Sequence, residues 1–157
     1  MMAFLWNLLL ALAWVALTGD FSGPNLLFGF VVGYLVLLMA SSQMNIGTSY
    51  TRKVPKIIGF VLFFITDLVK ANLRVAYDVI TPTHQMRPGV VAIPLTVDRD
   101  AEITILANLI SVTPGTLSLD VSSDRKVLYI HAMYIDSEQE LQESIKSLER
   151  RVMDILR

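Results

Sequence analysis

Four charged side chains recur at spacings of three and four in a mostly apolar stretch: Asp67, Lys70, Arg74 and Asp78. Residues at these spacings share one face of an α-helix, and we call this set the polar stripe. Ionisable side chains inside a membrane often mark a proton or ion path. Alternatively, Asp67 pairs with Lys70 and Arg74 with Asp78, at the membrane surface or against a partner. We favour this structural interpretation, because the stripe lies in the more polar half of the predicted helix.

A second candidate is the turn Thr113-Pro114-Gly115-Thr116, which separates a predicted helix from a predicted strand. Proline stops a helix, glycine permits a positive φ, and threonine hydroxyls can bond to freed backbone groups. These properties predict a conformational role and a positive φ at Gly115. A ligand-binding role for the same hydroxyls is the alternative.

Other chemistry finds little support in the sequence. Neither His84 nor His131 has a second histidine or a carboxylate at metal-ligand spacing, so we expect no metal site. The sequence contains no Gly-rich phosphate loop, no GxSxG, no HExxH and no cysteine. We therefore expect no enzymatic activity and no cofactor. A net charge of −1 and a pI of about 6.1 argue against nucleic acid as a partner.

The composition indicates that one part of the chain lies in a lipid bilayer and the other part in water. Hydrophobic residues make up 54% of the chain, charged residues 17%, and the mean hydropathy is +0.55. Soluble domains carry about a quarter charged residues. Before Arg52 the only charged side chain is Asp20, whereas charges are frequent after Thr83. We therefore predict a membrane domain over residues 1–82, a linker over 83–89 and a polar domain over 90–157.

The membrane domain is predicted to contain helices at about residues 1–18, 25–41 and 54–81. Residues that favour turns separate the first two helices, so we predict a helical hairpin. Because no lysine or arginine precedes the first apolar run, we expect a retained membrane anchor rather than a cleaved signal peptide. Gly29 and Gly33 form a GxxxG pattern, which permits close helix packing in lipid, although glycine is also common in membrane helices. Residues 41–51 are predicted to be a loop, with Pro55 in the first turn of the third helix.

The C-terminal domain is predicted to be α+β, in the order β-α-β-β-α. The strands are expected at residues 90–97, 117–121 and 127–135. Asp98 or Asp100 should cap the first helix, and Ser137 with Glu140 should form a capping box for the second. Pro94 favours an edge position, and the last strand is apolar on both faces, which suits the centre of a sheet. We infer an antiparallel sheet in the order 1-3-2 with both helices on one face, like a ferredoxin-like fold without its last strand.

Residues 107–120 (ANLISVTPGTLSLD) resemble the signature of the E subunit of Mrp-type (Mnh, Pha) multisubunit Na+/H+ antiporters. This stretch holds Asn108 and the Thr113–Thr116 turn. Residues 127–132 (VLYIHA), 87–95 (RPGVVAIPL) and 13–19 (AWVALTG) fit as well. Val112 departs from the leucine expected there, but keeps the apolar character.

The resemblance implies an accessory, non-catalytic subunit that supports assembly and exchange of Na+ or Li+ for protons. It implies multi-pass insertion in the bacterial inner (plasma) membrane, a part in pH homeostasis, and the other antiporter subunits and the lipid bilayer as partners. It also implies a cytoplasmic C-terminal domain. The alternative is a stand-alone membrane-anchored sensor or binding module with a cytoplasmic α/β domain.

The charge pattern does not decide the orientation. Arg52, Lys53 and Lys56 argue that the loop before the third helix is cytoplasmic. Three full crossings would then place the C-terminal domain outside. A cytoplasmic domain therefore requires either an outward start or a third helix that does not cross.

Overall fold

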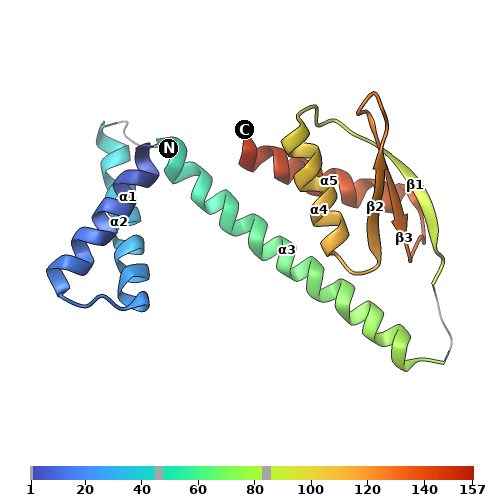
Figure 1. Ribbon diagram of the computed structural model, residues 1–157, viewed down its shortest axis with the longest axis horizontal. Coiled ribbons are helices and arrows are strands. Elements are labelled where there is room, and N and C mark those ends of the chain that lie inside the picture. Colours follow the sequence, from blue (N-terminus) through green and yellow to red (C-terminus); the bar gives the residue numbers. More distant parts are fainter. Residues whose placement is uncertain (1, 45–47, 83–85) are drawn as a thin grey trace. The chain divides into compact units, whose positions relative to one another are not determined.

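The computed structural model describes residues 2–44, 48–82 and 86–157. The chain divides into two compact units, Met1–Ile58 and Gly59–Arg157. The elements are, in order, α1 (Met2–Thr18), α2 (Gly23–Met44), α3 (Thr48–Ile80), β1 (Gly89–Pro94), α4 (Asp100–Val112), β2 (Thr116–Val121), β3 (Val127–Ala132) and α5 (Glu138–Leu156) (Figure 1). The division between the units lies within α3 rather than after it.

In the first unit, α1 and α2 form a hairpin with the two glycines of α2 against α1. A Cβ atom at Gly29 would lie 3.0 Å from the carbonyl oxygen of Ala11, and one at Gly33 would meet Asn7 and lie 3.1 Å from Cβ of Leu10. Asn7 and Ala11 have no exposed surface. The GxxxG pattern therefore serves close helix packing, as one of the two interpretations of the sequence predicted.

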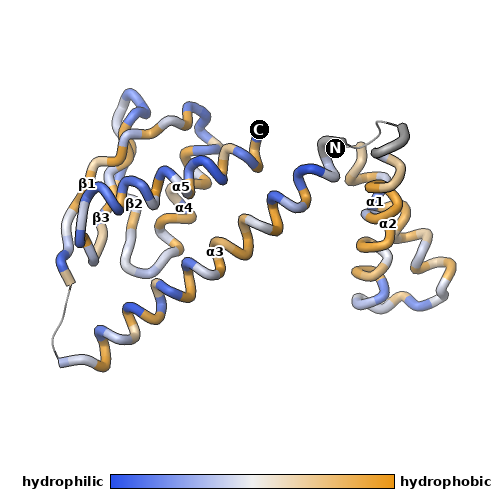
Figure 2. The backbone as a smooth tube through the Cα atoms, turned by 180° about the vertical axis from the view of Figure 1, so that it is seen from behind, coloured by the Kyte–Doolittle hydropathy of each residue, from blue (hydrophilic) through white to orange (hydrophobic). Residues whose placement is uncertain are grey.

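Both hairpin helices are predominantly hydrophobic, whereas hydrophilic and hydrophobic residues alternate along α3 (Figure 2). Within the described residues, one helical stretch is long and apolar enough to cross a bilayer: Gly23–Ser41 in α2. The helix α1 is also apolar but has only 17 residues. The helix α3 is not among the candidates for a membrane span, although it has 33 residues.

The boundary between α2 and α3 differs from the sequence prediction. The helix α2 continues to Met44 and α3 begins at Thr48, so much of the predicted loop at 41–51 is helical, and residues 45–47 lie outside the described part. Pro55 lies inside α3 rather than in its first turn. Proline has no N–H to donate to the carbonyl four residues earlier, that of Thr51. The hydroxyl of Tyr34 donates to this carbonyl oxygen at 3.0 Å, which compensates for the missing helical bond.

In the second unit, a three-stranded antiparallel sheet has the order β1-β3-β2. The predicted strand order is therefore confirmed, and Pro94 lies on an edge strand as expected. The third strand ends at Ala132, three residues before its predicted end, and β1 ends at Pro94. A register shift between Ser118 and Asp120 interrupts the pairing of β2 with β3.

The core lies on one face of this sheet, where α4 and α5 pack (Figure 1). Val91 and Ile93 of β1 pair in register with Ile130 and Leu128 of β3, and all four are buried. The core also contains Ile103, Leu106 and Ile110 of α4 and Ile145 and Leu148 of α5. The apolar periodicity of both helices is what directs these side chains to the sheet.

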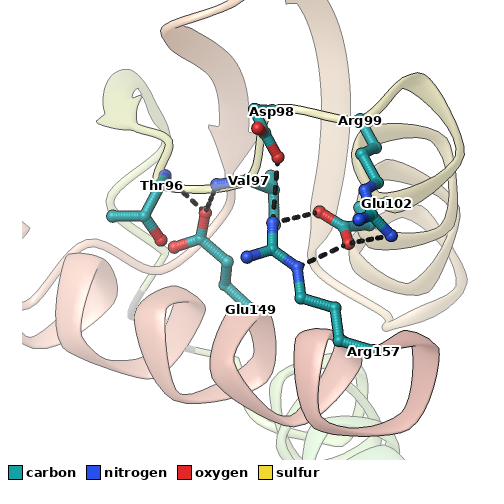
Figure 3. A network of polar contacts seen from close by, with 7 residues as sticks. All are labelled: Thr96, Val97, Asp98, Arg99, Glu102, Glu149 and Arg157. Atoms are coloured by element: carbon teal, nitrogen blue, oxygen red, sulfur yellow. Dashed lines mark hydrogen bonds and ion pairs between the residues drawn. The ribbon is translucent and has the colours of Figure 1, made fainter.

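Polar side chains hold the two core helices and the segment after β1 together (Figure 3). The carboxylate of Glu149 accepts hydrogen bonds from the backbone N–H groups of Thr96 and Val97 at 2.6 and 2.9 Å. Arg157 donates to both carboxylate oxygens of Glu102 at 3.0 Å and to Asp98 at 2.9 Å. Both glutamates are buried, and the sequence pattern did not single them out.

The predicted capping bonds are not formed, although Ser137 occupies the predicted N-cap position. Arg99, rather than Asp98 or Asp100, is the N-cap residue of α4, and it makes no side-chain capping bond. Ser137 is the N-cap of α5, but its hydroxyl makes no capping bond either. In α4 the reason lies in tertiary contacts, because Asp98 is engaged by Arg157 and Asp100 by Arg125.

Candidate functional site

Three of the four polar-stripe residues of α3 and the turn at residues 113–116 meet at one pocket of about 260 Å³ within the second unit, and Asp78 does not line it. The turn contributes all four of its residues. The remaining lining residues come from α3, from the segment after β3 and from α5: Asp67, Lys70, Ala71, Arg74, Tyr134 and Leu141. Two features that the sequence presented separately therefore belong to one site.

The turn is held by hydrogen bonds from its hydroxyl groups to backbone carbonyl groups near the end of α4. The hydroxyl of Thr113 donates to the carbonyl of Leu109 at 3.1 Å, and that of Thr116 donates to the carbonyl of Ile110 at 2.7 Å. Gly115 has φ +89°, the positive value that the sequence predicted. A Cβ atom on Gly115 would lie 3.3 Å from the ring of Tyr134, so both the conformation and the available space favour glycine.

Arg74 connects α3 to the segment after β3. Its guanidinium lies 4.3 Å from the ring centroid of Tyr134 and forms an ion pair with Asp136 at 2.7 Å. The pairs predicted from sequence, Asp67 with Lys70 and Arg74 with Asp78, are absent from the described residues. The reason is that α3 packs on the folded domain, which offers Arg74 an aromatic ring and a carboxylate together.

Asp78 and Tyr134 bring two buried polar groups face to face. Asp78 is 5% exposed, and neither its Oδ2 atom nor the hydroxyl oxygen of Tyr134 makes a hydrogen bond of standard geometry in the described part of the chain. The side chain of Asp78 beside it, together with burial, raises the pKa of the Tyr134 phenol above its ordinary value of 10.0. The phenol is thus protonated at neutral pH.

The other candidate residues lie elsewhere or outside the described residues. Asn108 is exposed on α4 and does not line the pocket. His131 is half-buried in β3, and His84 lies outside the described residues. No group of three or more His, Cys, Asp or Glu residues that could hold a metal ion occurs in the described ranges. Tyr134 and Asp136 were not predicted, because no local pattern indicates that they meet α3.

The pocket offers a guanidinium, an ammonium group, a carboxylate and threonine hydroxyls beside apolar surface. These groups suit polar contacts with another polypeptide or joining α3 to the domain. The structure shows that the site joins α3 to the domain. Arg74 and Asp78 of α3 contact Tyr134, which lies 60 positions after Arg74 in the sequence.

Comparisons with known proteins give a consistent result. Residues 7–155 match the family described as Na+/H+ ion antiporter subunit. The E subunit of the Na+/H+ antiporter of Alkalihalophilus pseudofirmus is 35% identical, over 98% of this chain and 99% of the relative. The E1 subunit of the Na+/H+ antiporter of Staphylococcus haemolyticus is 37% identical, over 95% of this chain and 94% of the relative.

Two solved structures are also similar. A chain of the Mrp complex from Dietzia sp. DQ12-45-1b matches with a TM-score of 0.50 and 28% identity, over 64% of this chain and 96% of that chain. A chain of the membrane-bound sulfane sulfur reductase, an archaeal respiratory membrane complex, matches with a TM-score of 0.54 and 23% identity, over 96% of this chain and 98% of that chain. The second likeness concerns the fold alone.

Proposed function

Because this chain belongs to the family of Na+/H+ antiporter E subunits, we propose that it is an accessory, non-catalytic subunit of a multisubunit antiporter that exchanges Na+ or Li+ for protons. The observation that carries the proposal is the match over nearly the full length of this chain and of its curated relatives. Its partners are then the other antiporter subunits, and its location is the plasma membrane.

We further propose that the C-terminal domain is cytoplasmic and that α3 does not cross the bilayer. The most apolar part of α3 packs on the polar domain: Phe60, Phe63 and Phe64 lie against its core, and the guanidinium of Arg151 lies 4.0 Å from the ring centroid of Phe63. A crossing by this segment would carry the charged helix α5 into hydrocarbon, which is costly.

With only α1 and α2 crossing, the cluster Arg52, Lys53 and Lys56 lies on the same side of the membrane as the C-terminal domain. The positive-inside rule then assigns both to the cytoplasm. This removes the conflict in the charge pattern without an outward start. We describe the domain as a ferredoxin-like fold without its last strand, which the strand order and the two helices on one face support.

Within this complex, we assign the pocket a structural role. It joins α3 to the domain through Arg74 and Tyr134, and the exposed carboxyl group of Asp67 is available to a neighbouring subunit. No ion path is assigned to the polar stripe.

The test is purification of the full-length, affinity-tagged chain from native membranes in a mild detergent. We expect several larger polytopic subunits to co-purify, and no such subunits from membranes that carry the untagged chain. Deletion of the gene should abolish Na+/H+ antiport, and the tagged chain should restore it. Recovery of the chain as a stable monomer, with antiport unaffected by its deletion, would contradict the proposal and favour a stand-alone sensor.

A further inference from the structure

The helix α3 exposes an apolar stripe on the side opposite its contact with the domain. Phe60, Phe64 and Asp78 are half-buried or buried on the domain side. Six large apolar residues recur on the other side at spacings of three, four or seven, and each is between 50% and 80% exposed. They are Ile58, Leu62, Ile65, Val69, Leu73 and Ile80, and we call them the outer stripe.

This arrangement differs from that in a soluble amphipathic helix, in which the side away from the core is charged and faces water. Here Arg74 and Asp78 face the domain, and no charged residue interrupts the outer stripe. From residue 58 to residue 80 the stripe is about 33 Å long at 1.5 Å per residue. Continuous apolar surface of this extent indicates contact with a membrane or a partner.

Two observations identify a lipid surface as the occupant. First, α3 begins at Thr48, only four positions after the end of α2, the helix that contains the candidate membrane span, so α3 starts at the bilayer. Second, Arg52, Lys53 and Lys56 come before the stripe, and no acidic residue lies between Thr48 and Thr66. Basic residues next to a membrane span are attracted to anionic lipid headgroups.

We propose that α3 lies in the membrane–water interface, with the outer stripe of Ile58, Leu62, Ile65, Val69, Leu73 and Ile80 in the acyl–headgroup boundary of the cytoplasmic leaflet. The proposal rests on the proposed topology, in which α3 does not cross the bilayer. The helix then holds the domain at the membrane surface through its inner side, where Arg74 contacts Tyr134. Interfacial helices of this kind bury their apolar side about 5–10 Å deep.

The chain contains no cysteine, so an introduced thiol is the only one in this chain, and the complex with the parent chain, treated with the same label, gives the signal from other subunits. Leu62→Cys, Val69→Cys and Leu73→Cys report on the outer stripe, and Lys70→Cys is the matched control beside Val69 on the polar side. Each full-length variant is assembled into the complex and reconstituted in vesicles of phosphatidylcholine and phosphatidylglycerol. The collision rates of the nitroxide with oxygen and with a water-soluble nickel chelate give its depth.

We expect the three stripe positions to be accessible to oxygen, shielded from nickel and at the same shallow depth, with the opposite preference at Lys70→Cys. A depth that changes steadily from position 62 to position 73 would show a crossing helix and overturn the proposal. Accessibility to nickel at all three positions would show water contact and also overturn it. Immobilised labels shielded from both reagents would show that another subunit covers the stripe, which again contradicts a lipid surface.

The proposed topology is tested separately. Ser123, in the exposed loop between β2 and β3, is changed to cysteine and treated with a membrane-impermeant maleimide in right-side-out and inverted vesicles. Labelling in inverted vesicles alone supports a cytoplasmic domain. Labelling only in right-side-out vesicles would refute the proposed topology and, with it, the assignment of the cytoplasmic leaflet. If the maleimide labelling supports the proposed topology but the spin-label depths do not, only the interfacial arrangement of α3 is wrong.

Discussion

At the scale of single residues, Gly115 is the most constrained position in the pocket. Its φ is +89° and the ring of Tyr134 would lie 3.3 Å from an added Cβ. We expect Gly115→Val to cost about 1–3 kcal/mol, a large share of the stability of a small domain. The melting temperature of the chain in detergent and the yield of assembled complex should both fall.

The control is Val112→Leu, because Val112 is 59% exposed and the change keeps an apolar side chain. It should leave melting temperature and yield unchanged. If Gly115→Val instead melts and assembles like the parent but abolishes antiport, the turn makes a functional contact and the structural interpretation is wrong.

Glu102 gives a prediction on pH. Its carboxylate is buried, and hydrogen bonds from Arg157 are the largest cause that lowers its pKa below the ordinary value of 4.5. A lowered folded-state pKa adds stability that is present above the unfolded-state pKa and is lost as pH falls through the folded-state pKa. Glu102→Gln should therefore lower the melting temperature at pH 7, and the difference from the parent should shrink below about pH 4.

Asp136→Asn is the comparison for this pH effect. This substitution also removes an ion pair, but the two side chains of that pair are 50% and 58% exposed. We therefore expect little change in melting temperature at any pH. If the melting temperature of Glu102→Gln is lower than that of the parent by the same amount from pH 7 to pH 3, packing rather than charge is responsible.

At the scale of elements, the hairpin of α1 and α2 depends on close approach at Gly33. A Cβ atom there would meet Asn7 and Leu10 of α1. Gly33→Ala should push the helices apart and lower the amount of folded chain in the membrane by several-fold. A loss of about 1 kcal/mol in stability lowers the ratio of folded to unfolded chain by roughly a factor of five. Gly59→Ala is the matched control, since nothing lies within 4 Å of its added Cβ and alanine favours a helix. Equal yields of the two variants would contradict the prediction.

The start of α3 offers a double-mutant cycle. The hydroxyl of Tyr34 donates to the Thr51 carbonyl, which Pro55 cannot reach because it has no N–H. Tyr34→Phe should destabilise the parent by about 1 kcal/mol. In a Pro55→Ala background the helix can supply its own N–H, so the same change should cost less. Identical costs in the two backgrounds, measured by unfolding in detergent, would show that the hydroxyl does not compensate for the proline.

At the scale of the whole molecule, the polar stripe should act in assembly rather than in transport. Arg74→Ala removes both the contact with Tyr134 and the ion pair with Asp136, which together contribute on the order of 1 kcal/mol. Arg74→Ala and Asp67→Ala should lower the amount of complex in the membrane, with antiport per complex unchanged. A normal amount of complex with loss of antiport in Asp67→Ala would overturn this and indicate an ion path.

Local rules of backbone geometry explain which features were predictable from the sequence. The apolar periods of helix and strand follow from pitch and pleat, so the element order, the central place of β3 and the edge position of Pro94 were all predicted. The positive φ of Gly115 followed from its place after a proline at a helix end. The family was recognisable because residues 107–120 carry its signature.

Contacts between distant segments were not predictable, because no local pattern specifies them. The sequence could not show that Arg74 meets Tyr134 and Asp136, that Arg157 reaches buried Glu102, or that the turn and the polar stripe share one pocket. The capping bond predicted at Asp98 failed for the same reason, since the carboxylate pairs with Arg157 instead. Packing interactions of many side chains together determine which side of α3 faces the domain. These interactions form only when the chain folds, so no local pattern predicts them.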